Sequence, residues 1–123
     1  MIDSYLWGRV DRISPEAPVP VMASEGRENR LGGAANVALN VQALGAEPVL
    51  CSVVGKDDNE AVFRELLHKR HMPDHGIMAD PQRITTTKTR VISNKQHLLR
   101  VDHEITSPLN EKKKKKFIAH ITS

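Results

Sequence analysis

The sequence has little cysteine and few aromatic side chains. Its 123 residues include one cysteine, two phenylalanines, one tryptophan and one tyrosine. A single cysteine excludes an internal disulfide framework and fits a reducing compartment. With so few aromatic rings, any core must be mostly aliphatic. We predict that Cys51 is a thiol packed in a buried strand and is not a nucleophile.

Long hydrophobic runs and an export signal are also absent. No segment approaches the roughly 18 apolar residues that a membrane helix needs, and Asp3 and Gly8 stand where a signal peptide needs a basic and then an apolar run. The 39% of hydrophobic residues is too high for a disordered chain, and 123 residues support one small domain at most. We therefore expect a soluble cytoplasmic protein that does not bind a membrane.

Positive charge is confined to one segment. The net charge is +3, from 18 basic and 15 acidic residues, and five of the basic residues form the run Lys112–Lys116. Without that run the balance is 13 basic against 15 acidic residues. The run has no interleaved aromatic residues and belongs to no recognisable nucleic-acid motif. It predicts the solvent-facing side of a helix, in preference to a contact with a nucleic-acid backbone.

Hydrophobic periodicity and turn residues predict an α/β protein. Residues 1–8 indicate the end of a strand or the loop after it. Residues 9–31 contain three prolines and predict an edge strand or an extended arm. The rest predicts helices over 34–44, from Asp57 to Met72 and from Ser107-Pro108 onward, strands over 47–55 and 77–79, and a hairpin over 85–102. The first helix is expected to bury Val37, Val41 and Leu44.

Candidate metal ligands do not form a convincing group. Asp57-Asp58 is interpreted as the cap of the second helix, with Glu60 in the capping-box position. The histidines at 68, 71 and 75 have helical spacing, but Pro73 breaks the helix that would align them. We therefore expect no metal site in this chain.

The hairpin decides which charged residues share a face. Two β-branched runs flank Asn94-Lys95. A two-residue loop there would pair Arg90 with Leu99 and Lys88 with Val101. In that register Arg100 points to the face opposite Lys88 and Arg90, and only a bulge or a twist would bring the three cations together.

The most constrained pattern of the sequence is rich in glycine. The run Gly32-Gly33-Ala34-Ala35-Asn36-Val37-Ala38 is followed by Gly45 and Gly55. Its residues and spacing resemble the first signature of the ribokinase-like (PfkB) carbohydrate kinases. Arg12–Pro20, Thr87–Ser93 and Leu99–Asp102 look like the D-glycero-β-D-manno-heptose-7-phosphate kinases of that family, the kinase half of bifunctional heptose kinase/ADP-heptose synthases. The resemblance covers essentially the whole chain.

The resemblance implies an incomplete ribokinase-like α/β/α sandwich with β-lid segments. Residues 1–123 would be the N-terminal part of the kinase domain, without its first strand and its C-terminal catalytic half. ATP and Mg²⁺ bind in that half in this family, so we expect no catalytic, cofactor-binding or metal-binding residue here. The implied function is the sugar-binding part of an ATP-dependent kinase that phosphorylates heptose 7-phosphate at its anomeric oxygen, in ADP-heptose biosynthesis.

An alternative function stays open. The chain could be a non-catalytic lid, oligomerisation or sugar-binding module that is inactive alone. Lid strands often pair between subunits in this family, which implies a homodimer. A nucleic-acid partner is not expected.

The candidate sugar-binding residues lie at the glycine-rich start of a helix. Gly32 and Gly33 let a polyhydroxylated ligand approach the backbone, and the helix start offers free N–H donors. The amide of Asn36 can both donate and accept. The alternatives are a plain tight turn for the glycines and a backbone hydrogen bond for Asn36. The resemblance implies that Asp3 binds sugar hydroxyls; otherwise Asp3 is a solvated terminal carboxylate.

Lys88, Arg90 and Arg100 are candidates for binding the phosphate that the sugar already carries. A dianion needs fixed cations, and arginine can bind it through two parallel hydrogen bonds. The alternative for each cation is a solvated strand face. The expected partner is a phosphorylated sugar.

Overall fold

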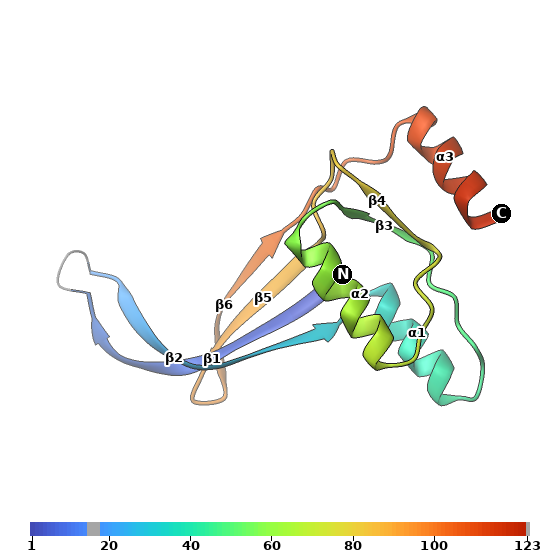
Figure 1. Ribbon diagram of the computed structural model, residues 1–123. Coiled ribbons are helices and arrows are strands. Elements are labelled where there is room, and N and C mark those ends of the chain that lie inside the picture. The colour runs from blue at the N-terminus through green and yellow to red at the C-terminus, as the bar shows by residue number, and fades with distance from the viewer. Residues whose placement is uncertain (15–17, 123) are drawn as a thin grey trace.

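Two sheets and three helices make up the described part of the chain (Figure 1). The computed structural model describes residues 1–14 and 18–122, except the side chains of residues 11 and 12. Residues 15–17, within the predicted family segment Arg12–Pro20, thus lie outside the described residues. The elements are β1 Ile2–Ile13, β2 Pro20–Leu31, α1 Ala34–Ala43, β3 Ser52–Gly55, α2 Asp58–Lys69, β4 Ile77–Asp80, β5 Thr87–Ser93, β6 Gln96–His103 and α3 Glu111–Thr122. Among the described residues, no helix has the length and hydropathy to cross a membrane.

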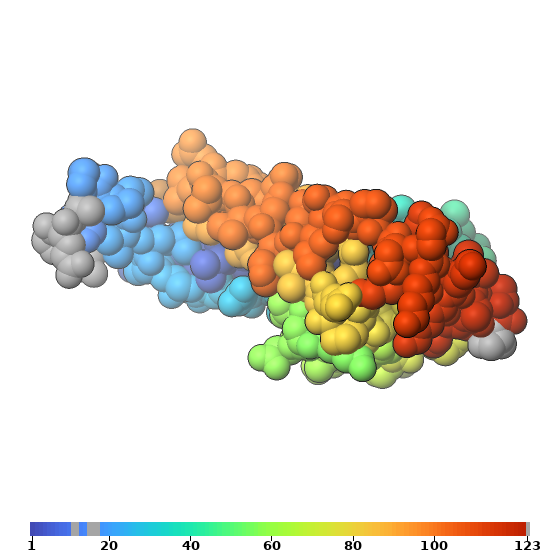
Figure 2. All heavy atoms as spheres, turned by 90° about the horizontal axis from the view of Figure 1, so that it is seen from above, coloured from blue at the N-terminus to red at the C-terminus, as the bar shows by residue number. Residues whose placement is uncertain are grey.

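β1 is a central strand of the four-stranded sheet, whose order is β2-β1-β5-β6. It is antiparallel to β2 and parallel to β5, and β6 is the far edge, open along one side of the molecule (Figure 2). The prediction of a strand end or loop over residues 1–8 is wrong, because β1 has ladders on both sides and continues to Ile13. The predicted edge strand within 9–31 is confirmed by β2, whose proline is its first residue.

β3 and β4 form a short parallel pair that runs from Ser52↔Ile77 to Gly55↔Asp80. The predicted strand over 77–79 is confirmed, whereas the one predicted over 47–55 begins only at Ser52. Cys51 precedes this ladder and is exposed. The prediction that Cys51 packs inside a buried strand is therefore wrong.

The hydrophobic core lies where α1, α2 and the two sheets meet. Its largest fully buried side chains include Phe63 and Leu67 of α2 and Ile2 of β1. α1 contributes the small residues Ala35 and Ala38. The other core residues are Leu31, Val54, Met72 and Ile77. Burying one large apolar side chain contributes about 1.5–3 kcal/mol, so Phe63 and Leu67 anchor α2 to the sheets.

The apolar stripe of α1 faces solvent. Val37, Val41 and Leu44 are 60%, 37% and 88% exposed, so the prediction that they are buried is wrong. The helix turns its alanine side to the core instead, and Val37 and Leu44 remain mostly uncovered by the described residues. Such a stripe is a surface that another apolar surface could cover.

The predicted cap of α2 is confirmed. Asp57 Oδ1 accepts a hydrogen bond from the N–H of Glu60 at 3.0 Å. The same carboxylate accepts from the N–H and the hydroxyl of Thr85 at 2.8 and 2.7 Å. Burial alone would raise the pKa of Asp57, but these hydrogen bonds outweigh burial and lower that pKa below its usual value. Asp57 thereby ties the start of α2 to the segment that leads into β5.

α3 begins at Glu111, later than the predicted start at Ser107-Pro108. The side chain of Asn110 caps it by accepting from the N–H of Lys113 at 2.8 Å. Lys113 Nζ lies 2.8 Å from Asp80 Oδ2 and its side chain is 23% exposed. The prediction of a solvent-facing lysine run is thus wrong for Lys113, while the other four lysines are exposed.

A buried and an exposed leucine give opposite predictions for stability. Leu67→Ala should lower the free energy of unfolding by about 2–5 kcal/mol, because it leaves a cavity in the core. Leu44→Ala should change it by less than about 0.5 kcal/mol, since that side chain faces water. Urea denaturation followed by circular dichroism measures both. A loss at Leu44 as large as the loss at Leu67 would show that the α1 stripe is covered in solution.

Candidate functional site

A β-bulge sets the register between β5 and β6. The predicted turn at Asn94-Lys95 is confirmed, and both residues have positive φ, 50° and 63°. Beyond the turn the register shifts between Val91 and Ile92, which leaves Leu98 as the extra residue. The pairs that follow are Val91↔Leu99, Arg90↔Arg100, Thr89↔Val101 and Lys88↔Asp102.

The bulge places the three candidate phosphate ligands on one face. Directly opposed residues share a face of an antiparallel pair, so Arg100 lies on the face of Lys88 and Arg90. The predicted pairing of Arg90 with Leu99 and Lys88 with Val101 is wrong by one position. The prediction that Arg100 points to the opposite face is wrong for the same reason.

β1 and β2 extend this face across the sheet. In the ladders Asp3 lies beside Lys88 and Arg30, and Tyr5 lies beside Arg90. Because side chains alternate along a strand, these residues all project from the same side. We call this side the polar face; it carries Asp3, Tyr5, Glu28, Arg30, Lys88, Arg90, Arg100 and Asp102.

Asp3 and Arg90 form the least exposed ion pair of the polar face. Arg90 Nη1 lies 3.0 Å from Asp3 Oδ1, and the two side chains are 23% and 17% exposed. Neither atom makes a well-oriented hydrogen bond within the described residues. The Asp3 carboxylate raises the pKa of the Arg90 guanidinium. Asp3 is thus held by a cation rather than solvated, and one oxygen keeps its capacity to accept from a hydroxyl.

Tyr5 lies between two arginines of the polar face. The guanidinium carbon of Arg30 is 4.6 Å from the centre of its ring, and that of Arg90 is 5.6 Å away. Both distances are within the range of cation–π attraction. Arg30 Nη2 also pairs with Glu28 Oε2 at 2.8 Å. The aromatic ring therefore fixes cations on both of its neighbouring strands.

Lys88 and Arg100 share the carboxylate of Asp102. Arg100 Nε lies 3.0 Å from Oδ1, and Lys88 Nζ lies 3.4 Å from Oδ2. Burial alone would raise the pKa of Asp102, but Arg100 and Lys88 outweigh burial and lower it. The structure therefore brings Lys88 and Arg100 to one point, whereas Arg90 is bound to Asp3.

Gly32 is required by the closeness of Asp3. A Cβ atom at Gly32 would lie 2.5 Å from Asp3 Oδ2, well inside van der Waals contact. Gly33 is required by its backbone, with φ 58° and ψ −132°. The two glycines thus form a tight turn and also let the backbone approach a carboxylate. Within the described residues, no hydrogen bond engages the N–H groups of Gly33 and Ala34, so the start of α1 offers two donors.

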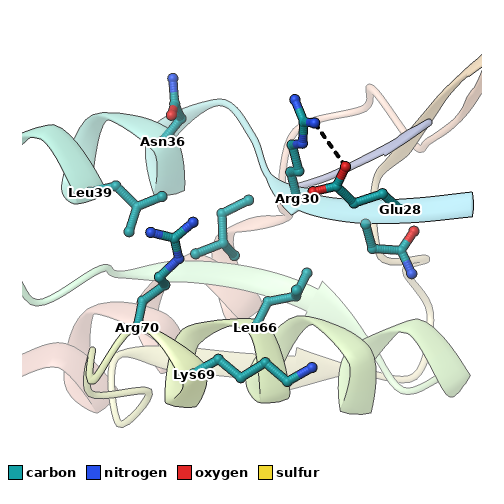
Figure 3. Close-up of a pocket in the computed structure, with 9 residues that line it drawn as sticks. Glu28, Arg30, Asn36, Leu39, Leu66, Lys69 and Arg70 are labelled. Carbon is teal, nitrogen blue, oxygen red and sulfur yellow. Dashed lines mark hydrogen bonds and ion pairs between the residues drawn. The ribbon is translucent and has the colours of Figure 1, made fainter.

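Asn36 is exposed on the first turns of α1. It stands at the rim of a cavity of about 340 Å³ whose walls come from β2, α1 and α2 (Figure 3). Figure 3 shows its amide and the guanidinium of Arg30 directed to the same side, away from α2. The described residues show no contact between Asn36 and Asp3, so the structure leaves Asn36 beside the polar face and not within it.

Sequence reasoning missed Tyr5, Arg30 and Asp102. Ile2 and Ser4 form the buried side of β1, and Asp3 and Tyr5 the other side. The sequence does not show this as an apolar/polar alternation, because Ser4 is polar and Tyr5, Leu6 and Trp7 are consecutive large side chains. Asp102 was hidden by the unbulged register, which places it away from Lys88.

The described residues do not fit a Mg²⁺ site. They contain no cluster of three or more His, Cys, Asp or Glu side chains that could hold a metal ion. His68 and Arg64 both pair with Asp74 at 3.1 Å, and each carboxylate of the polar face is paired with a cation.

The chain matches a known protein family over nearly all of its length. The family model described as pfkB family carbohydrate kinase matches residues 1–122. The bifunctional protein HldE of Helicobacter pylori (strain P12) is 46% identical over 120 residues, which are 98% of this chain and 26% of that protein. The chain thus spans about a quarter of the length of the curated relatives it matches.

Solved structures resemble the fold at low sequence identity. A fructokinase from Halothermothrix orenii superposes on 89% of this chain and 38% of its own, with a TM-score of 0.55 and 20% identity. A ribokinase from Cryptococcus neoformans in complex with ADP superposes on 83% of this chain and 31% of its own, with a TM-score of 0.55 and 19% identity. These likenesses show that the chain has part of a ribokinase-like fold.

A double-mutant cycle tests the contact between Gly32 and Asp3. Gly32→Ala should destabilise the chain by about 1–3 kcal/mol, because the added methyl group displaces the carboxylate. In an Asp3→Ala background most of that cost should vanish, since the clashing atoms are gone. Gly33→Ala is the control: its cost comes from the backbone and should persist in the Asp3→Ala background. Strictly additive effects of Gly32→Ala and Asp3→Ala in urea denaturation would contradict the contact.

Proposed function

Because the chain belongs to the pfkB family of carbohydrate kinases, we propose that it forms the sugar-binding part of an ATP-dependent sugar kinase. Residues 1–123 are in this proposal the N-terminal part of the kinase domain. ATP, Mg²⁺ and the catalytic base would bind or lie in a part of the domain that these residues do not include.

The observation that carries the proposal is the convergence of charged groups on the polar face. The bulge at Leu98 aligns Arg100 with Lys88 and Arg90, and β1 adds Asp3 on the same side. Fixed cations can bind a phosphate group, while Asp3 and the open N–H groups of α1 can bind hydroxyls. A ligand that carries both kinds of group, such as a phosphorylated sugar, matches this arrangement.

We propose heptose 7-phosphate as the sugar. The support is the resemblance of Arg12–Pro20, Thr87–Ser93 and Leu99–Asp102 to the heptose-7-phosphate kinases, together with the similarity to the HldE relatives. In this assignment Lys88, Arg90 and Arg100 take the phosphate, and Asp3, Gly32, Gly33 and Asn36 take the sugar hydroxyls. The kinase would then phosphorylate the anomeric oxygen, on the route to ADP-heptose.

Two substitutions should separate the sugar from the phosphate. Asn36→Ala should weaken binding of heptose 7-phosphate and of unphosphorylated heptose alike, by roughly 5- to 150-fold, for a loss of about 1–3 kcal/mol. Lys88→Ala should weaken only the phosphorylated sugar. Lys88 serves better than Arg90 here, because Arg90 also holds Asp3. The assay is titration calorimetry on a chimera in which this chain replaces the matching 120 residues of Helicobacter pylori HldE.

The unsubstituted chimera and Lys115→Ala are the controls. Lys115 is an exposed residue of α3 and does not belong to the polar face, so its loss should leave both affinities unchanged. If Lys88→Ala weakened the binding of both sugars equally, Lys88 would not be a phosphate ligand and would be interpreted as a solvated strand residue. No binding of either sugar by the unsubstituted chimera would exclude heptose as the substrate.

We propose in addition that two copies pair through the four-stranded sheet. All eight residues of β6 are exposed (Figure 2). Leu98, Leu99 and Val101 are 47%, 59% and 50% exposed. An uncovered edge strand with apolar side chains favours pairing with another strand.

Sedimentation of the full chain tests this pairing. The unsubstituted chain should form a dimer, and Leu99→Lys should shift it to monomer because a charge opposes burial of the edge. Leu44→Lys, on the exposed stripe of α1, should leave the dimer intact. A monomeric unsubstituted chain, or equal effects of the two lysines, would exclude the β6 edge as the interface.

A further inference from the structure

Asp102 contacts two of the three candidate phosphate ligands. Its Oδ2 lies 3.0 Å from Arg100 Nη2 and 3.4 Å from Lys88 Nζ. Its Oδ1 lies 3.0 Å from Arg100 Nε, so both carboxylate oxygens lie against the guanidinium, and Nη2 donates the hydrogen bond. One oxygen atom thus joins cations from two neighbouring strands.

A carboxylate in this position offsets two costs of gathering cations. Long Lys and Arg side chains lose rotamer freedom when they are held in place. Two like charges side by side also repel one another. Asp102 compensates both effects before any ligand binds. The three groups together still carry one net positive charge, and Arg100 keeps N–H groups that do not face Asp102.

We infer that Asp102 is a positioning residue, which holds Lys88 and Arg100 together so that both donate to the phosphate group of a phosphorylated sugar. The inference rests on the proposed function, because that function supplies the ligand. Asp102 also repels a phosphate dianion. We expect preorganisation to exceed this repulsion, because a donor pair that is already fixed pays less to bind an anion.

Glu28 provides a matched control on the same face. It is one of the polar-face carboxylates and pairs with Arg30 at 2.8 Å, with its side chain 47% exposed. It contacts neither Lys88 nor Arg100. Glu28→Gln therefore removes the same charge from the same side of the sheet and leaves the Asp102 pair in place.

The experiment titrates inorganic phosphate into the full chain by calorimetry. Asp102→Asn keeps the shape of the side chain and removes its charge, and it should weaken phosphate binding about 10-fold, which is about 1.4 kcal/mol. Asp102→Glu should restore part of the affinity, since it restores the carboxylate. Glu28→Gln should leave the affinity unchanged or tighten it, because it removes a repulsive charge and its ion-pair partner, Arg30, is not a proposed phosphate ligand. Circular dichroism checks that each variant is folded.

A second readout needs no ligand. Arg100 Nη2 donates a hydrogen bond to Asp102 Oδ2 at 3.0 Å, and Nε lies 3.0 Å from Oδ1. Because this contact holds the guanidinium in place, the Nε–H should exchange slowly with water in the unsubstituted chain and in Glu28→Gln, and ¹⁵N NMR measures that exchange. In Asp102→Asn the Nε–H should exchange faster. A purely electrostatic role of Asp102 would not produce this difference between the two variants.

Three results would overturn the inference. They are phosphate binding by Asp102→Asn that equals or exceeds that of the unsubstituted chain, an Arg100 Nε–H that exchanges equally in both, and no phosphate binding by the unsubstituted chain. Failure of the proposed function has another signature. The unsubstituted chain would then bind inorganic phosphate in an Asp102-dependent way but would not prefer heptose 7-phosphate to heptose.

Discussion

The buried face of β1 fixes the register of this strand, and the register places the charged groups on its other face. Ile2 and Ser4 are 1% and 0% exposed on the core side, while Asp3 and Tyr5 project from the polar face. A slip of one residue in the ladder with β5 would turn Ile2 to water and Asp3 into the core. The apolar core therefore holds the register of β1, and β1 in turn places Asp3 beside Lys88 and next to Gly32.

The polar face gathers several cations, and carboxylates on the same face pair with them. Four cations, from Arg30, Lys88, Arg90 and Arg100, stand against three carboxylates, from Asp3, Glu28 and Asp102, which leaves one net positive charge. Each carboxylate pairs with at least one cation at 2.8–3.4 Å. Pairing reduces the repulsion that would otherwise spread the cations apart. In the function proposed above, a phosphate ligand would meet donors that are already in place, which lowers the cost of ordering them.

Local sequence signals predicted the elements that depend on local physics. The cap at Asp57, the turn at Asn94-Lys95, the helix start at Gly32-Gly33 and the edge position of β2 all follow from side-chain hydrogen bonds or backbone preferences of a few residues. The failures depend on neighbours. Periodicity cannot show that Leu98 is an extra residue, because Leu98, Leu99 and Val101 satisfy either register. The side that α1 turns inward is decided by close packing of its alanines, and hydrophobicity alone favours the wrong stripe.

The candidate site follows the same division. Asp3, Gly32, Gly33, Asn36, Lys88, Arg90 and Arg100 could be named from their residue types and from a family resemblance. The sequence could not show which of these residues contact one another. Arg100 lies beside Lys88 only because of the bulge, and Asp102 and Tyr5 make their contacts only because of the order of the strands. Asn36 stays apart at the rim of its cavity.

The register of β5 against β6 in solution tests the central claim most directly. Cross-strand nuclear Overhauser effects in the full chain report which residues oppose one another. The account predicts backbone contacts between Arg90 and Arg100 and between Lys88 and Asp102. Contacts between Arg90 and Leu99 and between Lys88 and Val101 would contradict it, because Arg100 would then lie on the other face and the three cations could not converge.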